Sequence, residues 1–181
     1  MKRLFPLLLC GLASGCLSTP IETTEVPVSL AGWEGRAVDL GRGKGTITEY
    51  WPVGESPRSW TRLATVQFLE GDRHTAREAM EELRSRMRAR GGEGVVVSWE
   101  VIAEDETSLT CEWSIQGSPD HEDQVELARL LEGRDGLHRV AFTRKGAAFP
   151  EEERARWIEA LAGARVTKDG RPVGDGAGGQ E

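Results

Sequence analysis

Cys111 is the residue of this chain whose type best suits nucleophilic chemistry. It would be a catalytic nucleophile if a base lay beside it in an exposed, electropositive site. However, Cys111 alternates with Leu109 and Trp113 on one face of a predicted strand, and we expect that face to be buried. We therefore predict that Cys111 is a small buried hydrophobic residue, and a cysteine-dependent hydrolase is the least favoured of three functional hypotheses.

Metal binding is the second chemistry to consider. His74, His121 and His138 lack a close ligand spacing such as His-x-x-x-His. His121 lies in an acidic run, 120–123, directly after Pro119, where acids would cap a helix and complement its dipole. We expect His138 to pack on a strand face. The sequence therefore predicts neither a metal site nor a cofactor.

A glycine-rich run, Gly-Arg-Gly-Lys-Gly at 41–45, has the composition of loops that bind phosphate through backbone N–H groups. It lacks the Walker spacing and the Lys-Ser/Thr pair. A flexible turn leading into a strand is the better explanation. The chain contains no Gly-x-Ser-x-Gly and no His-Glu-x-x-His motif, so no common hydrolase signature is present.

Tryptophan is over-used, with six residues against a single tyrosine. Trp33, Trp51 and Trp60 lie in or beside predicted loops on the amino-terminal side. Exposed indoles there would form a platform for a sugar or a partner, because tryptophan is enriched at interaction hot spots. The alternative is that these side chains fasten the loops onto the sheet.

The amino terminus has the layout of a secretory signal. Lys2 and Arg3 open the chain, an apolar stretch follows, and small residues precede Cys16. That stretch is shorter than the roughly 20 residues of a membrane-spanning helix. Secretion with cleavage near Gly15 and no lipid is the alternative that this pattern alone leaves open.

The end of the segment, Leu-Ala-Ser-Gly-Cys at 12–16, resembles a bacterial lipobox. This resemblance implies that the Cys16 thiol is acylated and that the chain is cut just before it. More than one acyl chain is needed for stable attachment, and a tri-acylated cysteine provides them. Leu17, in place of the Asp that often retains such proteins in the inner membrane, implies an outer-membrane lipoprotein facing the periplasm.

Charge and cysteine content limit the partners of the mature chain. The segment 1–15 contains Lys2 and Arg3 but no acid, so its removal changes the net charge from −7 to −9. An acidic domain has no overall electrostatic reason to bind nucleic acid or anionic lipid. Cys111 is the one cysteine left without a predicted lipid, so we expect no internal disulfide. The expected partners are the membrane, through the lipid, and an envelope protein.

The elements that would position these residues follow from periodicity. Strand patterns occupy 46–51, 63–69, 95–103, 109–115 and 137–143, and helix patterns occupy 75–90, 119–132 and 150–162. Thr75 and Glu78 fit a capping box at the first helix. A short polar connection at 104–108 predicts a hairpin. The order β-β-α-β-β-α-β-α predicts an α+β domain with a mostly antiparallel sheet and about three helices.

The stretch Trp-Thr-Arg-Leu-Ala-Thr-Val-Gln at 60–67, together with the strand and helix at 137–161, resembles the Mog1/PsbP-like fold. The first stretch is also similar to one in uncharacterised bacterial envelope proteins. The resemblance covers about residues 46–165. It implies no catalytic residues, because such domains are mostly accessory or binding modules.

We therefore expect a signal peptide at 1–15, a lipidated terminus and flexible tether at 16–45, one domain at 46–165, and a disordered tail at 166–181. The first hypothesis is a non-enzymatic accessory or binding lipoprotein of the envelope. The second is a periplasmic ligand-binding domain that uses the loop tryptophans.

Overall fold

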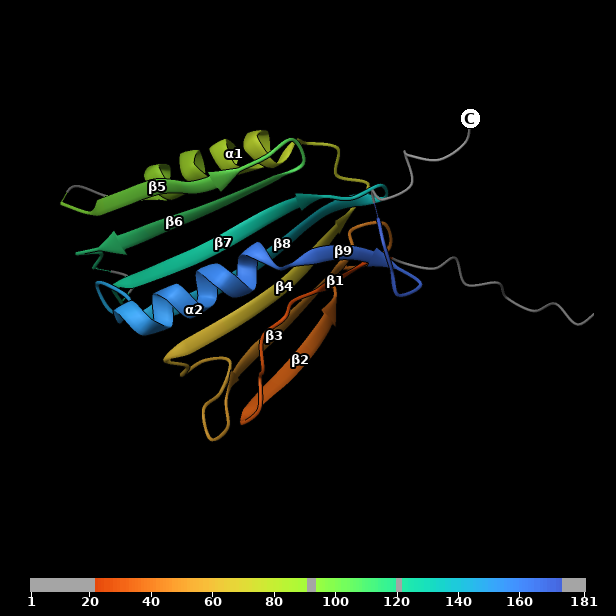
Figure 1. Ribbon diagram of the computed structural model, residues 1–181. Coiled ribbons are helices and arrows are strands. Elements are labelled where there is room, and N and C mark those ends of the chain that lie inside the picture. The colour runs from red at the N-terminus through yellow and green to blue at the C-terminus, as the bar shows by residue number, and fades with distance from the viewer. Residues whose placement is uncertain (1–21, 91–93, 120–121, 174–181) are drawn as a thin grey trace, which may run out of the picture.

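The computed structural model describes residues 22–90, 94–119 and 122–173 (Figure 1). Its first half contains β1 (Thr23–Glu25), β2 (Trp33–Asp39), β3 (Thr46–Pro52), β4 (Arg62–Glu70) and α1 (Ala76–Arg90). Its second half contains β5 (Val96–Glu104), β6 (Ser108–Gln116), β7 (Gln124–Glu132), β8 (Gly136–Lys145), α2 (Glu151–Ala162), β9 (Arg165–Lys168) and β10 (Arg171–Pro172). The predicted α+β class is confirmed.

A seven-stranded antiparallel sheet, in the order β2-β3-β4-β8-β7-β6-β5, forms the centre of the domain. Helix α1 packs over β5, β6 and β7, and α2 packs over β7 and β8 on the other face (Figure 1). A three-stranded sheet, β1-β9-β10, extends the α2 side, since β1 contacts β4 and β8. Because successive side chains of a strand point to opposite faces, there is one core on each side of the sheet.

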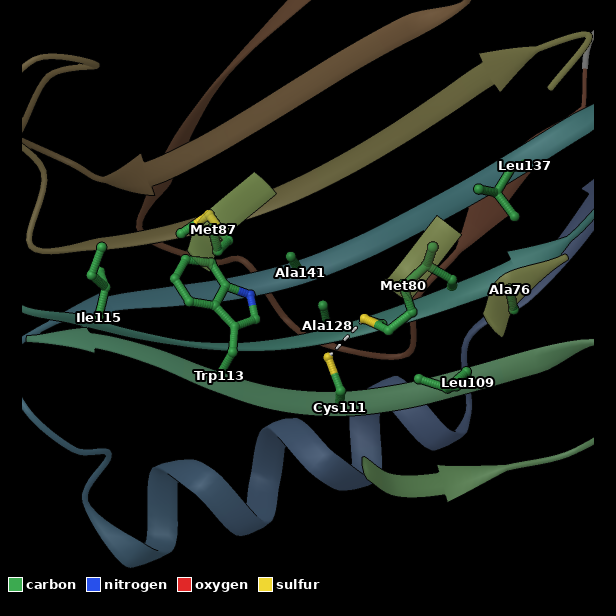
Figure 2. Packing of buried hydrophobic residues seen from close by; sticks show 11 residues of the cluster. Ala76, Met80, Met87, Leu109, Cys111, Trp113, Ile115, Ala128, Leu137 and Ala141 are labelled. Carbon is green, nitrogen blue, oxygen red and sulfur yellow. Dashed lines mark hydrogen bonds between the residues drawn. The ribbon is translucent and has the colours of Figure 1, made fainter. Parts of the chain in front are cut away.

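The core under α1 is built on alternate residues of β6, as the periodicity predicts. Its buried members are Ala76, Met80, Met87, Leu109, Cys111, Trp113, Ile115, Ala128, Leu130, Leu137 and Ala141. Figure 2 shows Met80 and Met87 of α1 reaching down to the sheet beside Cys111 and Trp113. Met80 is 1% exposed, and full burial of such a side chain contributes about 1.5–3 kcal/mol.

The core under α2 is centred on Phe142. Its ring stacks on that of Trp157 with centroids 4.1 Å apart, and Phe149 stacks on it at 5.6 Å. Trp157, Ala160 and Leu161 are the buried residues of α2, whereas Ala155 is exposed.

The edge strand β5 departs from its predicted alternation after Trp99. A bulge between Val101 and Ala103 shifts the register against β6. Val101, which still pairs with Cys111, is 45% exposed on this edge strand, whereas Ile102 packs against the core on the opposite face. A bulge also bends an edge strand and makes it a poorer template for pairing with another chain.

The predicted helix over 119–132 is wrong. Residues Gln124–Glu132 form β7, paired with β6 on one side and β8 on the other. The sequence of this strand is rich in Leu, Ala, Glu and Arg, which favour helices in isolation. Both faces of β7 are covered, so its apolar residues do not alternate with polar ones, and pairing with two neighbours overrides local propensity. The described residues accordingly contain two helices rather than about three.

The predicted tether and tail are also wrong where the structure describes them. Residues 23–25 and 33–39 are strands of the two sheets, so the folded domain includes part of the segment predicted as a tether. At the other end, 165–168 and 171–172 are paired strands, so ordered structure continues to Val173. The pairing of β1 with β9 joins the two ends of the described chain, and local composition does not reveal such a distant partner, whereas β2–β3 and β9–β10 are hairpins.

Candidate functional site

A groove runs between α1 and the part of the sheet formed by β4 and β8. Its volume is about 340 Å³, and its lining residues are Gln67, Leu69, Asp72, Ala79, Glu82, Leu83, Arg86, Met87, Leu130, Leu137 and Arg139. Leucines and Met87 make an apolar floor, while charged side chains stand at the rim. Glu82 and Arg86 lie 3.6 Å apart as an ion pair, so the rim charges of α1 largely neutralise one another.

The position of α1 creates this groove. Its start is fixed by the predicted capping box, in which the Thr75 backbone N–H donates to Glu78 at 2.9 Å and the Glu78 N–H donates to Thr75 Oγ1 at 3.2 Å. The Ala76 N–H also donates to Glu132 Oε1 at 2.8 Å, which ties the helix start to the end of β7. The helix therefore lies over β5–β7 and leaves the β4 side of the same face accessible.

A buried polar network adjoins the groove. Glu126, 5% exposed, accepts hydrogen bonds from Trp113 Nε1 at 2.8 Å and from Thr143 Oγ1 at 2.8 Å. Arg139 donates to the same carboxylate, and its Nε has no hydrogen-bond partner within the described residues. Because Arg139 also lines the groove, it links the network to any occupant. The sequence analysis missed Glu126 because it assigned 119–132 to a helix.

Cys111 is fully buried, as predicted, with its Sγ 3.3 Å from Met80 Sδ (Figure 2). Burial and the nearby Glu126 carboxylate raise the pKa of the Cys111 thiol far above its ordinary value. Nucleophilic attack requires the thiolate, so this environment suppresses the reactivity of the sulfur.

His138 is buried, as predicted, but between unexpected partners. Its Nδ1 lies 2.9 Å from Thr24 Oγ1 and its Nε2 lies 3.4 Å from Glu22 Oε2, while Phe68 stacks on the ring at 4.6 Å. Glu22 also accepts the N–H groups of residues 134 and 135 at 3.0 and 2.9 Å. Burial lowers the pKa of His138, and the Glu22 carboxylate opposes that shift. This group fastens the first described segment to the β7–β8 turn.

Among the described residues, His74 does not form a metal site with these groups. His74 is exposed and bonds Asp72 at 2.7 Å, which raises the pKa of this histidine. His121 lies outside the described residues. Over 22–90, 94–119 and 122–173, no three His, Cys, Asp or Glu side chains are arranged to hold a metal ion.

The three loop tryptophans do not form one platform. Trp33 pairs with Pro52 and Glu34 pairs with Trp51, so Trp33 and Trp51 project from opposite faces of the sheet. Trp51 is 7% exposed, so its indole offers almost no surface to a ligand. Trp33 and Trp60 are half-buried beneath the cations of Arg62 and Lys145, at 5.6 and 5.3 Å. The alternative, that these residues fasten loops onto the sheet, fits their environment better.

The glycine-rich run forms the β2–β3 turn. Within it the Lys44 N–H donates to Gly41 O at 3.0 Å, the Gly41 N–H donates to Asp39 at 2.8 Å, and Gly45 O accepts the Leu40 N–H at 3.0 Å. Donors already used in this way are not free to hold a phosphate. The predicted turn is confirmed.

Comparison with known proteins assigns no relative to the chain: no family model matches it, and no curated protein matches it. In the part that the structure describes, none of the helices has the length and apolar character needed to cross a membrane. Cys16, the predicted lipidation site, lies outside the described residues.

Proposed function

We propose that this chain is a non-enzymatic lipoprotein of the bacterial envelope. Acyl chains on Cys16 anchor it in the outer membrane, and its domain faces the periplasm as an accessory or binding module. The signal pattern ending at Cys16 supports the anchor, and Leu17 supports the outer membrane. The resemblance of 46–165 to Mog1/PsbP-like domains agrees with a binding role.

The groove beside α1 is the observation that carries the binding role. An apolar floor of Leu69, Leu83 and Leu137 favours an apolar group, and the mutually neutralised rim favours a ligand of low charge. An apolar side-chain cluster on an envelope protein fits this chemistry.

The placement of the nucleophilic and basic side chains supports the non-enzymatic part of the proposal. Cys111 and His138 are both fully buried, and they lie in different cores on opposite faces of the sheet. A nucleophile and its base must lie within hydrogen-bond distance of each other. These two side chains cannot cooperate in one reaction.

The binding role is tested by crosslinking the lipidated protein in envelopes and identifying co-purified proteins by mass spectrometry. We expect one stoichiometric partner, lost in Leu83→Gln, which places an amide in the groove floor. Arg88→Glu, on an exposed position of the same helix, is the matched control and should retain the partner. Ala79→Gln narrows the groove without altering its leucines. It gives a second test of the groove in case Leu83→Gln does not fold.

A partner retained by both groove variants would place binding elsewhere. A catalytic turnover abolished by Cys111→Ala or His138→Ala would overturn the non-enzymatic proposal. The anchor has its own test: Cys16→Ser should abolish labelling by a palmitate analogue and release the protein from sedimented membranes. Continued membrane attachment of that variant would contradict lipid anchoring.

A further inference from the structure

The outer edge of β2 is a regular strand edge without a neighbour among the described residues. β2 ends the large sheet, and Figure 1 shows it at the border of that sheet. Its residues 34–39 are all exposed. Unlike β5, β2 keeps one register with its neighbour from Trp33 to Asp39, and it contains no proline. Bulges and prolines are devices that blunt sheet edges, so this edge remains a template for another strand.

The register shows which backbone groups of β2 face outward. The Leu40 N–H donates to Gly45 O at 3.0 Å, directly after the last paired residue of β2. Hydrogen-bonded pairs alternate along an antiparallel ladder, so the even-numbered residues of β2 bond β3 and the odd-numbered residues direct N–H and C=O to the outer edge. These outward groups of Gly35 and Ala37 have no partner within the described residues.

Two side chains of this edge carry charges without a partner. Glu34 and Arg36 are exposed on the same face, and neither makes an ion pair or a hydrogen bond within the described residues. On β3, uncharged Trp51 lies opposite Glu34, and Glu49 lies opposite Arg36. Charges on an edge usually oppose pairing with another chain. These two have opposite signs and stand two residues apart, so a strand with the same pair in reverse order neutralises both.

A second copy of β2 supplies that reverse order. In an antiparallel pair centred on Gly35 of both copies, Glu34 of each copy lies opposite Arg36 of the other. The outward groups of the two Gly35 residues then bond each other, and each Ala37 N–H meets the Trp33 carbonyl of the other copy. On that face, small Ala37 lies opposite bulky Trp33, so the two backbones can approach.

Neighbouring registers are less favourable. A shift of one strand by two residues keeps the outward backbone groups facing each other. In one direction it places Arg36 opposite Arg36, and in the other it places Glu34 opposite Glu34. Opposite charges across a strand pair are stabilising and like charges are destabilising. Charge therefore selects a single register, and the contact uses the same residues of both copies, which closes a two-fold dimer.

We infer that this chain self-associates through the outer edge of β2 into a two-fold dimer, in which the two large sheets join into one. The partner is a second copy of the chain. The inference does not depend on the proposed anchor or on the groove. That groove lies between α1 and the β4–β8 part of the sheet, so it stays accessible in the dimer.

Disulfide crosslinking of the purified full chain tests the register. A Glu34→Cys protein is mixed with an Arg36→Cys protein and oxidised, and dimers are separated on a non-reducing gel. The two positions form a non-hydrogen-bonded pair with Cα atoms about 4.5 Å apart, within the range of a disulfide. Identical positions lie diagonally, about 7–8 Å apart. We expect several-fold more dimer from the mixture than from either variant alone. Oxidised wild type accounts for crosslinks through other cysteines.

Charge reversal tests the pairing without a crosslink. Glu34→Lys and Arg36→Glu each place like charges opposite each other, so each should raise the dimer dissociation constant several-fold, as measured by sedimentation equilibrium. The double variant restores opposite charges and should return the constant toward that of the wild type. Both positions are exposed, so the variants should fold, and circular dichroism checks this.

Three results would overturn the inference. One is equal crosslinking in the mixture and in the single variants. Another is a dissociation constant that the single reversals leave unchanged, or that the double reversal fails to restore. The third is a crosslink in whole cells from Arg36→Cys to a protein of different mass, since the edge would then serve another partner.

Discussion

Glu126 is a buried carboxylate that accepts hydrogen bonds from Trp113, Arg139 and Thr143. Removing one member of a buried charged network leaves the other members unpaired, which typically costs about 3–5 kcal/mol. We therefore expect Glu126→Ala to lower the free energy of unfolding by about that amount. Urea denaturation followed by tryptophan fluorescence measures the change.

Glu81→Ala is the control for Glu126→Ala. Glu81 pairs with Arg84 at 3.5 Å on the exposed surface of α1, and such pairs contribute at most about 0.5 kcal/mol. Glu126→Gln, which keeps an acceptor for Trp113, should lie between the two. Losses of similar size in Glu126→Ala and Glu81→Ala would show that the network does not stabilise the fold.

His138 makes stability depend on pH. Burial holds its pKa below the ordinary value of 6.5, so below pH 6.5 the unfolded chain binds more protons than the folded chain. The contribution of His138 is thus complete above pH 6.5 and declines as the pH falls toward the folded pKa. The slope reaches at most about 1.4 kcal/mol per pH unit. Glu22 and Asp135 are the charged groups that reduce the shift.

The measurement compares the free energy of unfolding of the wild type and His138→Gln at pH 7.5, 6.5 and 5.5. The stability advantage of the wild type should shrink as the pH falls. His74, whose pKa Asp72 raises, contributes stability that is present below pH 6.5 and is lost as the pH rises through its folded pKa. The comparison is therefore made in a His74→Gln background, so that the two proteins differ only at residue 138. A pH-independent advantage would contradict the assigned direction.

At the scale of elements, the β2–β3 turn depends on glycine at position 45. Gly45 has φ +94°, and a Cβ there would lie 1.9 Å from the carbonyl oxygen of Phe68 on β4. That oxygen belongs to backbone in the middle of the sheet and cannot move aside. We expect Gly45→Ala to reduce the midpoint of urea denaturation strongly.

Gly41→Ala in the same turn is the matched control, with φ +99° but open space around the added Cβ. It carries only the strain of positive φ, about 1–2 kcal/mol. Because of the steric conflict, the free energy of unfolding of Gly45→Ala should be lower than that of Gly41→Ala by about 2 kcal/mol. Equal stability of the two variants would mean that the turn adjusts without disturbing β4.

At the scale of the whole molecule, Glu22 joins the small sheet to the large one. Its carboxylate bonds the β7–β8 turn, and the adjacent β1 pairs with β9. Peripheral units of this kind can open without global unfolding. We expect Glu22→Ala to remove hydrogen-exchange protection from β1 and β9 while the amides of β6–β8 stay protected.

Glu25→Ala tests the specificity of that effect, because Glu25 lies on β1 in an exposed pair with Arg165 at 2.8 Å. Exchange in this variant should match the wild type. If Glu22→Ala instead accelerated exchange throughout β6–β8, the two sheets would form a single cooperative unit.

Local signals explain which elements the sequence predicted correctly. The capping box at Thr75, the alternation of β6 and the hairpin after β5 each depend on residues close together in the chain. The burial of Cys111 follows from the same alternation. Side-chain alternation and capping are local, so one sequence is enough to establish them.

The identity of β7 as a strand and the position of the groove depend on contacts between separate elements, and only the tertiary structure shows them. β7 is a strand because β6 and β8 pair with both of its edges, and its covered faces remove the alternation that would have identified it. The groove exists because α1 docks over β5–β7 rather than over β4. Sequence determined the segments and their caps, and long-range packing determined which residues meet.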